Sequence, residues 1–90
     1  MVRLYVIVVY DIAVERIDSV RKFLKQYMMW KQNSVFEGEL TKAEFEIVKR
    51  GVRELIDEEA DYVIFYILRD EKYLKREELG EAKVDMGNVI

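Results

Sequence analysis

The chain carries near its start a nine-residue hydrophobic run, Val2-Arg3-Leu4-Tyr5-Val6-Ile7-Val8-Val9-Tyr10, which Asp11 follows directly. The run is rich in β-branched and aromatic residues and is apolar at odd and even positions alike, a pattern typical of a strand buried on both faces. Such a strand would hold the Asp11 carboxylate in a fixed position at the rim of a core, which suits a metal ligand. Asp is also a favoured N-cap residue, so a cap on the following helix is the alternative.

Two amphipathic helices and a second buried strand are expected after this run. Apolar residues at helical spacing predict a helix over residues 14–28. A second helix is predicted to start at Thr41-Lys42-Ala43-Glu44, which has the spacing of a capping box. The segment Trp30 to Leu40 is predicted to form one bent strand or a tight hairpin, and the sequence leaves both open. Tyr62–Leu68 is apolar at every position and predicts another strand covered on both faces.

This order of elements predicts one domain over residues 1–90, of class α+β, with the ferredoxin-like βαββαβ architecture. In that architecture both helices cover one face of an antiparallel sheet. Because neither long strand offers a polar face, we expect the same sheet of a second copy to cover the other side, giving a homodimer formed by sheet-face packing. An extra C-terminal strand or tail, about residues 80–90, is expected to dock on the partner subunit.

The composition limits the chemistry that the chain can perform. Its 90 residues include no Cys and no His, and the formal net charge is -3. Disulfides, thiolate metal sites, cysteine nucleophiles and the usual general base near neutral pH are therefore excluded. Carboxylates remain, and they are ligands for Mg²⁺, Mn²⁺ or Ca²⁺. No run is long enough to span a bilayer and no signal peptide is recognisable, so we expect a cytoplasmic protein with no membrane partner.

Basic residues are concentrated in one part of this mildly acidic chain. Residues 16–31 contain a single acid, Asp18, and five bases: Arg16, Arg21, Lys22, Lys25 and Lys31. A basic face of this kind is what a polyanion would meet. The alternative is that these bases form an ordinary solvated face of the helix. The basic residues of the helix, considered by themselves, favour this alternative.

A polar and aromatic segment and an acidic turn are the other candidates. Ser34 and Asn33 could hydrogen-bond a phosphate or a base, and Phe36 could stack on a base, although a place in the core is the alternative for Phe36. The acidic residues 57–61 lack the ligand spacing and the glycine of a calcium loop. We therefore expect a solvated turn there.

Together these segments resemble the CRISPR-associated adaptation protein family that accompanies the spacer integrase, whose members are often described as endoribonucleases. The resemblance covers roughly residues 2 to 80 and is specific because the pieces occur together at this spacing. The matching segments are Val9-Tyr10-Asp11-Ile12, the helix with Arg16 and Arg21, Gln32-Asn33-Ser34-Val35-Phe36-Glu37-Gly38-Glu39-Leu40, and the acidic turn that leads into Tyr62–Leu68.

The resemblance implies a ferredoxin-like homodimer in which the Asp11 residues of both subunits face each other across the two-fold axis. The pair would hold one divalent metal, Mg²⁺ or Mn²⁺, for phosphodiester hydrolysis, so Asp11 is the implied catalytic and metal-ligating residue. Where many members have arginine, this chain has Lys31, which keeps the charge but loses bidentate phosphate recognition. The implied nucleic-acid-binding residues are Tyr10, Arg16, Arg21, Lys31, Ser34 and Phe36.

The expected function is that of a CRISPR adaptation protein with metal-dependent endonuclease activity, acting with the spacer integrase in the acquisition of new spacers. The expected substrates are single-stranded RNA or double-stranded DNA. A non-catalytic DNA-binding scaffold that bridges integrase dimers is the first alternative, and a generic ferredoxin-like module that binds RNA or a ligand is the second. The sequence does not separate nuclease from scaffold, because both need the dimer, the basic face and the fold.

Overall fold

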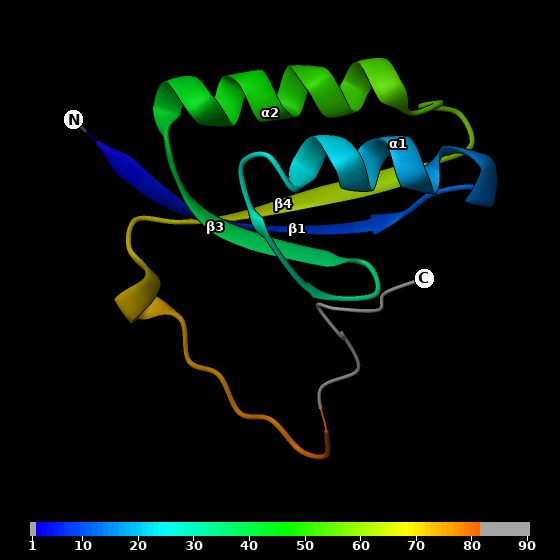
Figure 1. Ribbon diagram of the computed structural model, residues 1–90. Coiled ribbons are helices and arrows are strands. Elements are labelled where there is room, and N and C mark those ends of the chain that lie inside the picture. The colour runs from blue at the N-terminus through cyan, green and yellow to red at the C-terminus, as the bar shows by residue number, and fades with distance from the viewer. Residues whose placement is uncertain (1, 82–90) are drawn as a thin grey trace.

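The computed structural model describes residues 2–81 and shows, within them, a four-stranded antiparallel sheet covered on one face by two helices (Figure 1). The strands β1 (Arg3–Asp11), β2 (Met29–Gln32), β3 (Val35–Thr41) and β4 (Tyr62–Leu68) lie in the order β2-β3-β1-β4. Helix α1 (Val14–Leu24) connects β1 to β2, and α2 (Lys42–Leu55) connects β3 to β4. The predicted α+β class and ferredoxin-like βαββαβ order are confirmed.

Helix α1 is one turn shorter than the sequence predicted. It ends at Leu24, and the next residues turn back towards the sheet, with the amides of Tyr27 and Met28 both donating to the Leu24 carbonyl. Met28 is buried in the core all the same. The apolar spacing that continued the helix therefore belongs to a turn that packs its side chains inwards.

The segment between the helices forms a hairpin, which settles the alternative left open by the sequence. Strands β2 and β3 pair across a turn at Asn33 and Ser34, with a bulge between Trp30 and Gln32. A bulge makes a short edge strand twist and bend, which is why the pattern did not distinguish a hairpin from a bent strand.

Helix α2 begins with the predicted capping box. The Thr41 hydroxyl accepts from the Glu44 amide at 3.1 Å, and the Glu44 carboxylate accepts from the Thr41 amide at 2.8 Å. The helix packs closely on α1 at Gly51, where a Cβ atom would lie 2.1 Å from the ring of Phe23. Neither helix of residues 2–81 is long and apolar enough to cross a membrane.

The core lies between the sheet and the helices. Alternate residues of β1 point into it, and Val6, Val8 and Tyr10 are buried there. The fully buried side chains of this layer also include Phe36, Leu40, Val20, Leu24, Val48 and Val52. This single core is what fixes the end of β1, and with it Asp11, in space.

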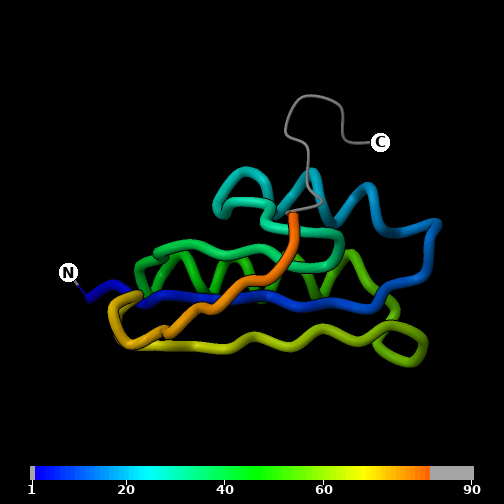
Figure 2. Tube along the Cα trace, turned by 90° about the horizontal axis from the view of Figure 1, so that it is seen from below, coloured from blue at the N-terminus to red at the C-terminus, as the bar shows by residue number. Residues whose placement is uncertain are grey.

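The opposite face of the sheet, here called the open face, is apolar along the middle of β1 and along β4, carries Glu37 and Glu39 on β3, and is only partly covered. It carries the other residues of β1 and β4, among them Ile7 and Tyr66, which pair across the two strands. Tyr66 is 52% exposed. After the short 3-10 helix η1 (Glu71–Tyr73), the chain crosses this face beneath β1 and β3 (Figure 2). Most of the tail that was predicted to dock on a partner, about residues 80–90, lies outside the described residues.

Candidate functional site

Asp11 is the last residue of β1, and its side chain is exposed. It belongs to the set of β1 residues that line the open face, and its neighbour across β4 is Tyr62. The N-cap position of α1 is Ala13, with no side-chain hydrogen bond at the cap. The alternative that Asp11 caps this helix is therefore wrong. Among residues 2–81 no group donates a side-chain hydrogen bond to the Asp11 carboxylate, so the fold leaves it available to a ligand.

The carboxylate that accepts a hydrogen bond from the start of α1 is that of Asp61, the last residue of the acidic turn (residues 57–61). One Asp61 oxygen accepts from the Ala13 amide at 2.9 Å, and the other accepts from the Asp57 amide at 2.9 Å. The Asp61 side chain has no exposed surface. The sequence predicted that this turn is solvated. The structure corrects that prediction at Asp61, whose side chain is buried. Asp61 was missed because its partner lies 48 residues away, and no local pattern signals a contact of that range.

Arg16 completes the Asp61 cluster. Its Nε donates to Asp61 at 2.6 Å and its Nη2 donates at 3.0 Å, a bidentate pair. Arg16 holds the pKa of the Asp61 carboxyl well below its usual range, and the two backbone donors lower it further. The pair in turn raises the pKa of the Arg16 guanidinium. Any phosphate at Arg16 has to compete with a carboxylate already in place, so the predicted nucleic-acid contact stays a prediction.

Tyr10 and Arg21 meet at the hairpin turn, on the helix side of the sheet. The Tyr10 hydroxyl donates to the Asn33 carbonyl at 2.9 Å and accepts from Arg21 Nε at 3.1 Å. Arg21 Nη2 donates to the same carbonyl at 3.0 Å. The two predicted site residues are therefore brought together, with neutral acceptors around the guanidinium. Tyr10 itself is buried, on the sheet face opposite Asp11.

The remaining predicted residues come from the hairpin and differ in access. Lys31 is exposed on the edge strand β2, and Ser34 is half-buried in the turn, where its carbonyl accepts from the Tyr10 amide at 3.1 Å. Phe36 has no exposed surface and packs beside Tyr10 and Trp30. The predicted contact of Phe36 with nucleic acid is wrong, because no base can reach its ring. The turn that carries Ser34 is nevertheless adjacent in space to the end of β1.

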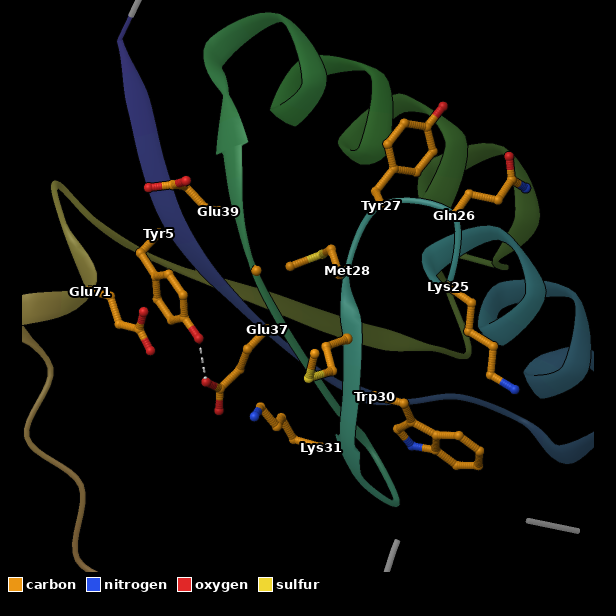
Figure 3. A pocket seen from close by; sticks show the side chains of 12 residues that line it. Tyr5, Lys25, Gln26, Tyr27, Met28, Trp30, Lys31, Glu37, Glu39 and Glu71 are labelled. Carbon is orange, nitrogen blue, oxygen red and sulfur yellow. Dashed lines mark hydrogen bonds between the residues drawn. The ribbon is translucent and has the colours of Figure 1, made fainter. Parts of the chain in front are cut away.

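A second carboxylate cluster, which the sequence did not indicate, lies on the open face. Glu37 accepts from the Tyr5 hydroxyl at 2.8 Å, a contact drawn in Figure 3, and from both Nη atoms of Arg76 at 2.6 and 2.9 Å. Arg76 lowers the pKa of Glu37, while burial, followed by the contact with Glu37, raises the pKa of Tyr5 to about 12. Arg76 thereby fastens the crossing segment, residues 74–81, to β3.

The described residues offer few ligands for a metal ion. Within residues 2–81 no group of three or more carboxylates lies close enough to hold one. Asp11 is a hard, anionic oxygen ligand on a rigid strand end, which suits Mg²⁺ or Mn²⁺, and such ions keep several waters when few protein ligands are present. A shared site with one Asp11 from each of two chains is compatible with this donor set.

Comparison with known proteins gives a consistent result. The family model described as CRISPR associated protein Cas2 matches residues 4–76. A protein of Methanosarcina acetivorans named CRISPR-associated endoribonuclease Cas2 is 58% identical over 97% of this chain and 100% of its own length. The protein of the same name from Thermococcus kodakarensis is 52% identical, again over 97% of this chain and 100% of its own length.

Solved structures agree with the sequence comparison. A crystal structure titled as that of cas2 superposes with a TM-score of 0.82 at 41% identity, covering 98% of this chain and 99% of the other. The crystal structure of Streptococcus pyogenes Cas2 at pH 6.5 gives a TM-score of 0.74 at 36% identity, covering 84% of this chain and 99% of the other.

Proposed function

Because the chain belongs to the Cas2 family of CRISPR-associated proteins, we propose that it is a metal-dependent endonuclease of CRISPR adaptation with Asp11 as its catalytic residue. Its substrate is single-stranded RNA or duplex DNA, and it acts together with the spacer integrase. The names of its relatives support the nuclease class. The availability of the Asp11 carboxylate is the observation that carries the assignment to this residue.

The position of Asp11 supports a catalytic rather than a structural role. The helix start that Asp11 could have capped is served by Asp61, as the hydrogen bond from the Ala13 amide shows. An exposed carboxylate at the end of a buried strand costs little entropy to orient, since the core already holds its backbone. Nothing in the described fold needs the Asp11 charge.

Asp11 from each of two copies would hold the metal ion, which when bound would supply an activated water and charge stabilisation at the phosphodiester. The chain has no histidine to act as a base, so Asp11 would also orient this water by accepting a hydrogen bond from it. The Tyr10 amide holds the Ser34 carbonyl, which keeps the hairpin turn beside the strand end. With one protein ligand per chain, we expect weak metal affinity and slow turnover.

The proposed site requires a dimer, and the open face supports one. Tyr62 and Tyr66 on β4 are 62% and 52% exposed, and Asp11 lies on the same face at the end of the neighbouring strand. A second copy packing sheet to sheet would remove this apolar surface from water. The same contact would bring the two Asp11 residues towards each other.

The decisive comparison is between wild type and Asp11→Asn on labelled single-stranded RNA and duplex DNA. We expect Asp11→Asn to abolish cleavage, because a neutral amide loses the metal while the fold is unchanged. Wild-type cleavage should stop with a chelator and return with Mg²⁺ or Mn²⁺. The matched control is Asp18→Asn, which removes an exposed carboxylate from α1 and should cleave as wild type does. Equal cleavage by wild type and Asp11→Asn would refute the proposal.

A non-catalytic DNA-binding scaffold for the integrase is the second candidate. The sparse donor set within residues 2–81 favours it, because a scaffold needs no metal. Spacer acquisition in cells separates the two functions. Loss of acquisition with Asp11→Asn but not with Asp18→Asn supports the nuclease, whereas normal acquisition with both variants supports the scaffold.

A further inference from the structure

Two cations at the end of α1, Arg21 and the C-cap residue Lys25, share one aromatic ring. The guanidinium carbon of Arg21 lies 4.5 Å from the centre of the Trp30 ring, and Lys25 Nζ lies 4.8 Å from it. Figure 3 shows the Lys25 side chain reaching from the end of α1 to the indole on β2. Like charges one helical turn apart repel each other. The electron-rich face of an indole offsets that repulsion without neutralising either charge.

The ring that holds these cations is itself fixed. Trp30 is 7% exposed, and its Nε1 donates to the Gln32 carbonyl at 2.8 Å. The indole lies nearly parallel to the buried Phe36 ring, with 9° between the planes and 6.1 Å between the centres. Arg21 is further held by the Tyr10 hydroxyl and the Asn33 carbonyl, both neutral acceptors. The two charges are therefore ordered by the fold, without a carboxylate.

This arrangement distinguishes Arg21 and Lys25 from the arginines whose charge an acid compensates. Arg3, Arg16 and Arg76 each form an ion pair with an acid. Within residues 2–81, by contrast, neither Arg21 nor Lys25 forms one. Lys25 and Trp30 also line an open groove of about 890 Å³ beside the edge strand β2, which Glu37, Glu39 and Glu71 line as well, and Lys25 itself is exposed. An anion can reach this corner from solvent.

We infer that Arg21, Lys25 and Trp30 form a binding site for the phosphodiester backbone, with Trp30 as the positioning residue that holds the two cations ready. The inference rests on the proposed function for the identity of the anion as nucleic acid. The chemistry agrees, because two ordered cations one helical turn apart can contact successive phosphates of a linear polyanion, whereas a single carboxylate would engage them less well. The site lies on the helix side of the sheet, away from Asp11, so it binds substrate without taking part in the reaction.

The test uses the full chain, and Trp30 is its only tryptophan. Tryptophan emission is followed in chelator, so that no metal-dependent cleavage occurs, while duplex DNA or single-stranded RNA of equal length is added. We expect emission to change with binding, and affinity to fall as salt rises. Lys25→Gln should reduce the slope of log K against log salt by about 0.9 for duplex DNA and by about 0.7 for a single strand. A response to only one of the two identifies the nucleic acid that the site takes.

Three variants separate positioning from stability. Lys42→Gln, an exposed lysine at the start of α2, should leave the salt slope unchanged. Trp30→Phe keeps an aromatic face and should retain the wild-type slope, whereas Trp30→Leu should lose affinity and show a reduced slope. Both Trp30 variants are followed by the anisotropy of labelled nucleic acid. Circular dichroism and melting confirm that each variant is folded, and Lys25→Gln tests the site even if Trp30→Leu does not fold.

Several outcomes would overturn the inference. Nucleic acid that binds without changing Trp30 emission and with an unaltered slope in Lys25→Gln binds elsewhere. Polyglutamate of matched charge producing an equal response would show that the site does not select phosphates. Absence of any binding would also refute it. The emission assay does not measure cleavage, so its outcome is independent of the cleavage assay. If nucleic acid changes the Trp30 emission while Asp11→Asn cleaves as wild type does, this binding site stands and the proposed nuclease is refuted.

Discussion

Replacing Arg76 by Met tests the contact that fastens the crossing segment to the open face. The substitution removes the charge and keeps an aliphatic side chain of similar length. Glu37 then retains only the Tyr5 hydroxyl as a partner, although its side chain is 5% exposed. The expected loss of stability comes mainly from leaving this buried carboxylate without its cation.

The size of the effect follows from the burial of the two partners. Breaking a fully buried ion pair costs about 3–5 kcal/mol, and an exposed pair contributes about 1 kcal/mol or less. Glu37 is buried but the Arg76 side chain is 38% exposed, so water screens part of the interaction. We therefore expect Arg76→Met to lower the free energy of unfolding by about 2 kcal/mol. In a domain of this size, that corresponds to a fall of about 8–16 °C in melting temperature.

Urea unfolding at pH 7 is the appropriate assay, because urea is uncharged and does not screen ion pairs as guanidinium salts do. Protein concentration is held constant, since a dimer would make stability depend on it. Lys75→Met is the matched control, because Lys75 is the exposed neighbour of Arg76 and forms no ion pair within residues 2–81. A glutamate-specific protease should also cut the crossing segment faster in Arg76→Met than in this control.

The double variant makes the reasoning refutable. Glu37→Gln still accepts from Tyr5 and frees an arginine that can reach water, so it should cost less than Arg76→Met. Combining the two should restore part of the stability that Arg76→Met loses, because no unpaired charge remains. If Arg76→Met matches wild type, or if the two losses simply add, the pair does not hold the segment.

Three further predictions concern packing, pH and assembly. Gly51→Ala should destabilise the protein, because overpacking against Phe23 costs about 1–3 kcal/mol and the helix propensity gained is about 1 kcal/mol; a raised melting temperature would contradict this. Glu37 and Asp61 have lowered pKa values in the folded state. Their contribution to the free energy of unfolding is therefore complete above their ordinary pKa values of 4.5 and 3.8 and is lost as pH falls through the folded values. The urea midpoint should fall from pH 7 to pH 3, and less steeply in Glu37→Gln. Wild type should sediment at twice the mass of one chain at micromolar concentration and Tyr66→Asp as a monomer, whereas a monomeric wild type would contradict the dimer.

The elements of the fold were predictable because their signals are local. Nine residues of β1 and seven of β4 are apolar at nearly every position, and the capping box at Thr41 marks the start of α2 within four residues. The end of α1 was misplaced because Tyr27 and Met28 keep helical spacing within a turn. Periodicity shows which side chains face the core, and a turn can satisfy it as well as a helix can.

The site was predicted less completely, for a physical reason. Asp11 could be singled out because its position follows from the strand before it. Its alternative role as a helix cap could not be dismissed, since that required knowing where Asp61 lies. The partners Asp61 and Ala13, and likewise Arg76 and Glu37, are 48 and 39 residues apart and meet only through the topology of the sheet. No periodicity in the sequence records such a contact.

The same limitation applies to the basic face, where charge count alone is misleading. Arg16 and Arg21 lie on one helix, five residues apart, and the family resemblance implies the same nucleic-acid-binding role for both. The fold gives Arg16 a buried carboxylate and gives Arg21 a hydroxyl, a carbonyl and an indole. Only the second environment orders a guanidinium and leaves its charge uncompensated. A binding surface for a polyanion is thus decided by which acids the topology brings to the bases, and on α1 this favours the end near Trp30 over the end near Asp61.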